Sequence, residues 1–194
     1  MSTTQPIKDK TALENFKNYY LAKQNFRNYS LIVTGLNTAL RISDLLSLQW
    51  KNVYDFSSRC FFKHIRITEQ KTGKQSIIAM NSSVKNSLSI LLNSKSRCPR
   101  LPDDYIFNSS KNPQMPLSRY QAYRIIREAA SAAHLEAPVS CHSLRKTFGY
   151  FAWKEGVPPA MLMNIYNHSS YQITKKYLCI EQDDRDEVFL NINI

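Results

Sequence analysis

Glycine is scarce in this chain, which has only four glycines among its 194 residues. Phosphate-binding loops of the Walker type and of dinucleotide-binding proteins need closely spaced glycines, because the backbone must approach the phosphates closely. The chain also lacks a Gly-x-Ser-x-Gly elbow and a His-Glu-x-x-His pair. These absences argue against nucleotide hydrolysis, dinucleotide chemistry and the common serine and zinc hydrolases.

Paired metal ligands are also missing. The four cysteines, Cys60, Cys98, Cys141 and Cys179, lie 38, 43 and 38 positions apart, and no Cys-x-x-Cys occurs. They predict reduced thiols rather than a zinc site or a disulfide framework. Carboxylates cluster only near the C-terminus, in a stretch that lacks the glycine and the ligand spacing of a calcium loop. We expect neither a metal nor an organic cofactor.

Long hydrophobic runs are absent. The longest, residues 148–153, spans about six residues and includes a glycine, whereas a membrane helix needs ~20. The N-terminus lacks the charged-then-apolar order of a signal peptide. With 43% hydrophobic residues, the chain is predicted to form one globular domain in the cytoplasm, with no membrane contact.

Positive charge dominates: 26 Lys and Arg outnumber 15 Asp and Glu, for a net +11. Residues 178–194 hold five of the acids and one of the bases, so the first 177 residues carry a formal charge of +15. Such a charge favours a polyanionic partner, since each neutralised phosphate releases counterions. The bases are scattered rather than gathered on one amphipathic helix, which disfavours a membrane surface. Solubility alone is the other explanation.

The hydrophobic periodicity predicts a mainly α protein with a small antiparallel β-sheet (α+β). Thr11 and Glu14 resemble a capping box, and Ser43 is the expected N-cap of a short helix. A strand over 60–68, a turn at Lys71 and a returning strand over 75–80 form a β-hairpin. Helices are predicted over residues 11–25, 27–36, 43–46, 82–93, 119–134, 143–155, 159–166 and 171–178.

One segment combines residues suited to binding an anion. His142 and Arg145 lie three residues apart at the expected start of a helix, so both can face one ligand. A helix N-terminus adds unpaired N–H groups and the positive end of the dipole. Alone, this pair is common on protein surfaces. Four further candidates accompany it: Arg41 upstream, Lys71 at the hairpin tip, His168, and Tyr177 nine residues after that histidine.

In this order and at this spacing, the chain resembles the catalytic domain of the tyrosine recombinase (phage integrase) family from about residue 7 to residue 177. Two departures stand out: Ala39 and Asn167 occupy positions where the family usually has glycine. Asparagine tolerates a left-handed backbone nearly as well as glycine does. Ala39 raises the question of how closely the chain can pack beside Arg41.

The resemblance implies a role for each candidate residue. Guanidinium groups bind phosphate oxygens two at a time, so Arg41 and Arg145 would clamp the scissile phosphate. Tyr177 would attack the phosphorus, with His142 as the acceptor of its proton. Lys71 would protonate the leaving 5′-oxygen and His168 would hold a phosphate oxygen. Asp44, close to Arg41, would brace a catalytic cation.

The resemblance also implies the assembly. Residues 1–177 would form the catalytic domain that breaks and rejoins DNA, and residues 178–194 an acidic and then apolar tail that docks on a neighbouring subunit or, alternatively, on its own domain. The expected partners are double-stranded DNA, further copies in a dimer or tetramer on DNA, and accessory DNA-bending proteins. Few residues precede the first predicted helix, as expected for a short, single-domain recombinase on the bacterial nucleoid.

The implied function is a site-specific recombinase or integrase acting through a 3′-phosphotyrosyl intermediate. A relaxing enzyme of the type IB topoisomerase kind would use the same residues. A DNA-binding regulator that has lost its chemistry, or a helical nucleic-acid-binding module that resembles the family by chance, would need none of them. At single positions, Lys74 competes with Lys71, Arg41 could pair with Asp44 on a helix surface, and Tyr177 could be an aromatic core residue.

Overall fold

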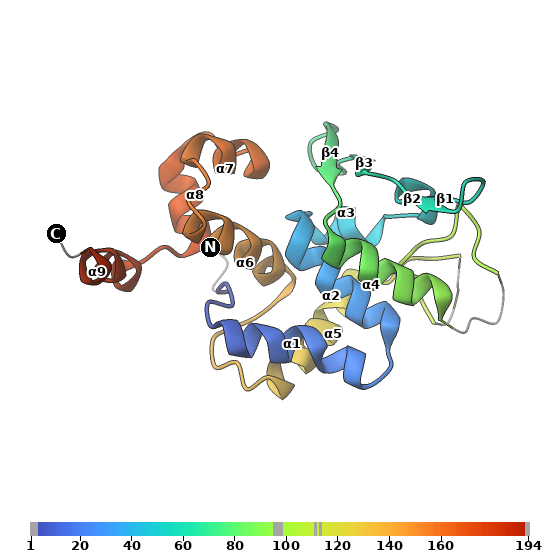
Figure 1. The fold of residues 1–194 in the computed structure, drawn as a ribbon, viewed down its shortest axis with the longest axis horizontal. Coiled ribbons are helices and arrows are strands. Elements are labelled where there is room, and N and C mark those ends of the chain that lie inside the picture. Colours follow the sequence, from blue (N-terminus) through green and yellow to red (C-terminus); the bar gives the residue numbers. More distant parts are fainter. Residues whose placement is uncertain (1–3, 95–98, 111, 113, 193–194) are drawn as a thin grey trace.

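The computed structural model describes residues 4–94, 99–110, 112 and 114–192, so Cys98 and Ile194 lie outside it. Nine α-helices run through these residues, with two pairs of short strands and one 3₁₀ turn (Trp50–Asn52) after α3 (Figure 1). The helices are α1 (Lys10–Ala22), α2 (Phe26–Thr38), α3 (Ile42–Leu46), α4 (Ser82–Asn93), α5 (Arg119–Ala132), α6 (Cys141–Lys154), α7 (Pro159–Tyr166), α8 (Tyr171–Leu178) and α9 (Gln182–Asn191).

Side-chain caps set several helix starts. The Asp9 carboxylate accepts the Ala12 N–H at 2.6 Å and begins α1, so the capping box predicted at Thr11 is wrong. Likewise, the N-cap of α3 is Arg41 rather than the predicted Ser43, and the helix begins at Ile42. Ser118 is the N-cap of α5, which begins at the predicted residue 119. Helices α4, α7 and α8 have the predicted bounds.

The strands form two sheets rather than the single one predicted. Strand β1 (Tyr54–Asp55) pairs with β2 (Cys60–Phe61), and β3 (His64–Thr68) pairs with β4 (Gln75–Ala79), both antiparallel. The predicted strand over 60–68 is interrupted at residues 62–63, where the chain leaves one sheet and enters the other. The hairpin β3–β4 is confirmed and carries Lys71 in its loop.

The buried side chains form two clusters. The larger one joins α1 to α5 and the start of α6, with Phe16, Ile32 and Phe107 fully covered. The smaller one lies between α6, α7 and α8 and consists of Leu162, Tyr166, Leu178 and Ile180, together with Ala39 from the end of α2. In Figure 1 the helices α6, α7 and α8 lie together on one side of the body, and the β3–β4 hairpin rises from the other. Helix α6 contributes to both clusters and links them.

Gly149 lets α6 come unusually close to α7 and α8. A Cβ added there would lie 2.3 Å from the Tyr166 hydroxyl and 2.5 Å from Cδ2 of Leu178. Any side chain would push the two helices away from α6. The absence of a side chain therefore sets the spacing of the three helices that carry Arg145 and Tyr177. No helix in the described ranges combines the length and apolar character that crossing a bilayer requires.

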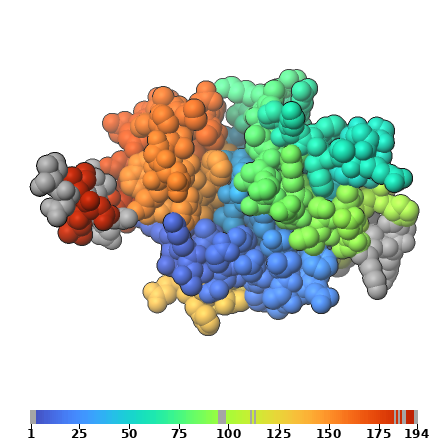
Figure 2. Space-filling model, in the orientation of Figure 1, coloured from blue at the N-terminus to red at the C-terminus, as the bar shows by residue number. Residues whose placement is uncertain are grey.

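Helix α9 was not predicted and extends from one end of the body (Figures 1 and 2). Its first turn is fixed by the buried Asp184, which accepts hydrogen bonds from the Lys8 ammonium (2.9 Å), the Tyr150 hydroxyl (2.8 Å) and the Glu181 N–H (2.8 Å). Farther along, Phe189 and Leu190 are 78% and 83% exposed. The tail is thus anchored at its base and exposed toward its end.

Candidate active site

A cleft of about 760 Å³ opens between the two clusters. Four parts of the chain meet there: the start of α3, the hairpin loop, the start of α6, and the stretch from the end of α7 to α8. All six predicted catalytic residues line it: Arg41, Lys71, His142, Arg145, His168 and Tyr177. Residues up to 136 positions apart in the sequence therefore surround one space.

Arg145 forms the floor of the cleft and is only 7% exposed. Its guanidinium donates to the carbonyl oxygens of Ala39, Ile165 (3.4 Å) and Tyr166 (3.5 Å), and it lies 4.5 Å from the Tyr166 ring centroid. Burial lowers the pKa of Arg145 from its usual value, while the phenol of Tyr177 favours the charged form. Neutral carbonyls fix the guanidinium without neutralising it, so its charge stays available to an anion.

Arg41 is held by Glu69, which was not predicted as a site residue. Its guanidinium pairs with Glu69, which also accepts hydrogen bonds from the hydroxyls of Thr72 (2.9 Å) and Ser76 (2.8 Å). Burial raises the pKa of Glu69, but the hydrogen bonds from Ser76, Thr72 and Arg41 outweigh it and leave the pKa lowered. Glu69 thus orients Arg41 from the base of the hairpin. Its place two residues before Lys71 was the available signal.

Asp44 has a different partner from the one predicted. Its carboxylate is 1% exposed, and Oδ1 accepts the Gln70 N–H at 2.9 Å. Among the described residues, Oδ2 has no hydrogen-bond partner. The expected brace to a catalytic cation is therefore replaced by a bond to the backbone just before Lys71, and the alternative surface pair of Arg41 with Asp44 is wrong, since Arg41 pairs with Glu69.

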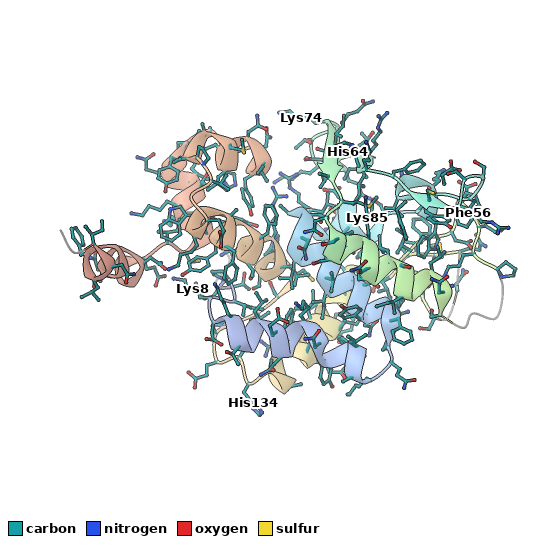
Figure 3. The ribbon with its side chains drawn as sticks, viewed as in Figure 1. Lys8, Phe56, His64, Lys74, Lys85 and His134 are labelled. Carbon is teal, nitrogen blue, oxygen red and sulfur yellow. The ribbon has the colours of Figure 1, made fainter. Side chains whose placement is uncertain are left out.

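The two hairpin lysines occupy different places. Lys71 is exposed and lines the cleft. The Lys74 ammonium donates to the Asn167 side-chain oxygen at 2.7 Å, and Figure 3 shows Lys74 at the tip of the hairpin. Asn167 ends α7 with a left-handed backbone (φ 55°), so its side chain points back across to the hairpin. Lys74 therefore ties the hairpin to α7, while Lys71 reaches the cleft.

His142 is the second residue of α6, after the N-cap Ser140. Partial burial of its ring lowers its pKa, and the positive charges of Lys146, Arg145 and Arg119 lower it further. A lowered pKa leaves the imidazole neutral at pH 7, with a nitrogen able to accept a proton.

His168 follows the left-handed turn at Asn167. Its Nδ1 lies 3.1 Å from the Thr174 hydroxyl, which fixes the ring against α8. Burial lowers the pKa of His168, as do the charges of Arg145 and Arg41. Both cleft histidines are thus neutral at pH 7. The other two histidines, His64 and His134, are exposed and lie outside the cleft, and Figure 3 shows His134 at the opposite edge of the molecule from the hairpin.

Tyr177 lies on α8 with its ring 5.3 Å from the Tyr166 ring and 5.3 Å from the His168 ring. Burial raises its pKa, and the charge of Arg145, a hydrogen bond from Arg145 and the charge of Arg41 oppose this increase. The hydroxyl therefore remains protonated at pH 7 but lies among cations that favour its anion. Two guanidinium groups, one flexible lysine, two neutral histidines and a phenol make a site suited to nucleophilic attack on a phosphate.

The cleft has one further cationic residue and no cluster of metal ligands among the described residues. Arg119, the first residue of α5, also lines it and was not predicted as a site residue; its position directly after the N-cap Ser118 was the available signal. Within the described residues, no group of three or more His, Cys, Asp or Glu side chains is placed to hold a metal ion. Cys60, Cys141 and Cys179 are free thiols.

The sequence matches the phage integrase family over residues 8–183. It is 39% identical over 183 residues to the probable integrase/recombinase YoeC of Bacillus subtilis (strain 168), covering 94% of this chain and 93% of YoeC. The fold superposes on XerA recombinase with a TM-score of 0.72 and 19% identity, covering 99% of this chain and 68% of XerA. It also superposes on XerH site-specific recombinase bound to a palindromic difH substrate, with a TM-score of 0.70 and 18% identity. This match covers 96% of this chain and 52% of XerH. The predicted fold class is confirmed.

Proposed function

Because this chain belongs to the phage integrase family and is a tyrosine-type site-specific recombinase, we propose that it cuts and rejoins double-stranded DNA through a covalent bond to Tyr177. The observation that supports this most directly is the shared cleft of about 760 Å³, which the two arginines and the phenol line together. The formal charge of +15 on residues 1–177 supports a nucleic-acid partner.

In the cleavage step, the Tyr177 oxygen attacks the scissile phosphorus. A Tyr–O–P bond forms on the 3′ side, and the bond from phosphorus to the 5′-oxygen breaks. The phenolic proton passes to the neutral His142, and the leaving 5′-oxygen takes a proton from Lys71 and departs as a hydroxyl. No external energy source is needed, since the phosphotyrosyl ester replaces the phosphodiester that was broken.

Charge stabilisation falls to the arginines. Negative charge grows on the non-bridging oxygens as Tyr177 attacks, and Arg41 and Arg145 can each offer two parallel N–H donors to those oxygens. Both are fixed before DNA arrives, Arg145 by three carbonyls and Arg41 by Glu69. Prearranged donors of this kind stabilise a transition state without reorganising during the reaction. His168 holds one of the oxygens from the α8 side.

Strand exchange needs a second DNA end and further subunits. The reaction reverses when a 5′-hydroxyl from a partner duplex attacks the phosphotyrosyl bond, displacing Tyr177. We infer a tetramer on two paired sites in the bacterial cytoplasm, assembled with residues 178–194 of each subunit docking on its neighbour and helped by DNA-bending proteins. The exposed Phe189 and Leu190 at the end of α9 support docking in trans.

The test is capture of the covalent intermediate. A duplex nicked near the recombination site loses the short 5′-hydroxyl strand after cleavage, so the protein–DNA adduct accumulates and survives denaturant. Tyr177→Phe should abolish this adduct, and Arg145→Ala should slow its formation by roughly 10²–10³-fold. An adduct that persists in Tyr177→Phe would overturn the assignment. Relaxation of a supercoiled plasmid that carries a single site then separates a relaxing enzyme from strand exchange, which needs two paired sites.

A further inference from the structure

Lys146 is a buried cation beside the cleft to which the proposed reaction gives no part. It follows Arg145 on α6 and is 3% exposed. Among the described residues, no carboxylate forms an ion pair with it. Burying a charge without an opposite charge is costly, and an apolar side chain at such a position is usually as stable or more stable. A residue that costs stability in the fold calls for a functional explanation.

The contacts of Lys146 converge on the nucleophile. Its ammonium donates to the Thr4 carbonyl at 2.6 Å and to the Cys179 sulfur at 3.6 Å, and it lies 5.3 Å from the Tyr177 ring centroid. Cys179 ends α8 in a left-handed conformation (φ 56°) two residues after Tyr177. Lys146 therefore touches both the ring of the nucleophile and the turn that ends its helix.

We propose that Lys146 is a positioning residue for Tyr177: it fixes the ring through α8 and supplies an uncompensated positive charge that favours the phenolate. The proposal depends on Tyr177 being the nucleophile. A cation over the face of a phenol is attracted to the ring, and more strongly when solvent is excluded. The attraction grows when the phenol ionises, so it acts on the reactive state more than on the resting one.

Lys146 also acts on the proposed proton acceptor. It lies one helical turn after His142 on α6, and its charge is, after burial, the leading reason why the pKa of His142 is lowered. In the proposal, one buried ammonium acts on both groups that share the proton: on Tyr177 through its contact with the ring, and on His142 through its charge. The other polar and charged groups that face Tyr177 come from α3, α6, α7, the α7–α8 turn and α8, namely Arg41, Arg145, Tyr166, His168 and Cys179.

The experiment compares Lys146→Met, which keeps the length and loses the charge, with Lys146→Arg, which keeps the charge. Adduct formation is followed in single turnover from pH 5 to pH 10. Without the charge, the pKa values of Tyr177 and His142 both rise, so the whole pH–rate profile moves to higher pH. At pH 7, Lys146→Met should be roughly tenfold slower, and Lys146→Arg should regain most of the rate. The melting temperature of Lys146→Met should equal or exceed that of the wild type.

Lys154→Met is the matched control, because Lys154 lies on the same helix, is exposed and packs 6.0 Å from another tyrosine ring, that of Tyr150. It should leave rate and profile unchanged. A Lys146→Met protein with wild-type rate and profile would overturn the proposal, as would a uniform loss at every pH with a lowered melting temperature. A measurement without DNA separates failure of this proposal from failure of the proposed reaction. The carbon-13 chemical shift of the Tyr177 ring, assigned by comparison with Tyr177→Phe, should titrate at higher pH in Lys146→Met than in the wild type.

Discussion

At the residue scale, the cleft is built from side chains whose partners fix them without neutralising them. Arg145 is held by carbonyl oxygens and His168 by the Thr174 hydroxyl. Among the cleft side chains that the structure describes, Arg41 alone has an acidic partner, Glu69. A site prepared in this way keeps its positive charge for the phosphate and loses little freedom when DNA binds.

The two neutral histidines make a prediction about acid. Their pKa values lie below the ordinary 6.5 because of burial and the nearby cations. Cleavage should stay constant as the pH falls from 8 to about 6.5 and decline only below that, because protonation removes the acceptor at His142. Single-turnover adduct formation across this range measures it. An acid limb centred above pH 6.5 would contradict the lowered pKa values, and His142→Gln should lose the limb together with most of the rate.

The resemblance to the family allowed the six residues to be named, and the structure brings all six to one cleft, while their roles stay predictions. Glu69 could not be assigned in that way: its role depends on Arg41, which lies 28 residues away and meets it only after the hairpin has folded back. The Asp44 prediction went wrong for the same reason. Sequence proximity suggested Arg41 as its partner, whereas folding brings the Gln70 amide closer.

At the element scale, the hairpin is tied to α7 by one hydrogen bond between Lys74 and Asn167. Asn167 stands where glycine is usual, and its left-handed backbone means that Asn167→Gly removes the side chain without strain. Lys74→Met removes the other partner. The bond fixes the strand that continues from Lys71, so both variants should leave Lys71 less well placed.

We expect each single variant to slow cleavage of ordinary DNA about threefold to tenfold, and the double variant to be no slower than either one, because the two residues act through one contact. With sulfur in place of the bridging 5′-oxygen, the leaving group needs no proton and the loss should vanish. Lys71→Ala is the reference for full loss of the acid, roughly 10²-fold or more. A large loss in Lys74→Met with none in Asn167→Gly would make Lys74 itself the acid.

Element boundaries followed from local chemistry where a cap or a breaker was decisive, as at Ser118 and at Pro159. Prediction failed where tertiary contacts decide. The break at residues 62–63 depends on pairing with β1, which is too short to show a pattern. Helix α9 has acidic and apolar residues without a clear apolar face, so periodicity gave no sign of it.

At the scale of the whole molecule, the tail offers a test of assembly. Phe189 and Leu190 are exposed near the end of α9, whereas Asp184 anchors its base. Replacing both apolar residues by serine should leave binding to a single DNA site intact and weaken assembly on paired sites by about tenfold or more, as measured by sedimentation. Truncation after Ile180 would also remove the Asp184 anchor, so the point variant is cleaner.

The control for the tail is Leu101→Ser, since Leu101 is 56% exposed on a loop outside α9. It should assemble as the wild type does. Unchanged assembly of the tail variant would instead mean that α9 serves its own subunit. The division into residues 1–177 and a separate tail, taken from the sequence, would then have to be abandoned.

Because its base is anchored, α9 can reach only a fixed distance from the body of its subunit. Seven residues of α9 follow Asp184 and rise about 1.5 Å each, so the helix extends only ~10 Å beyond the pivot that Lys8, Tyr150 and Asp184 hold in place. A neighbour receiving the far end must stand within that span. The separation of adjacent subunits, and with it the distance along DNA between two cut positions, would then be dictated by the length of a single short helix.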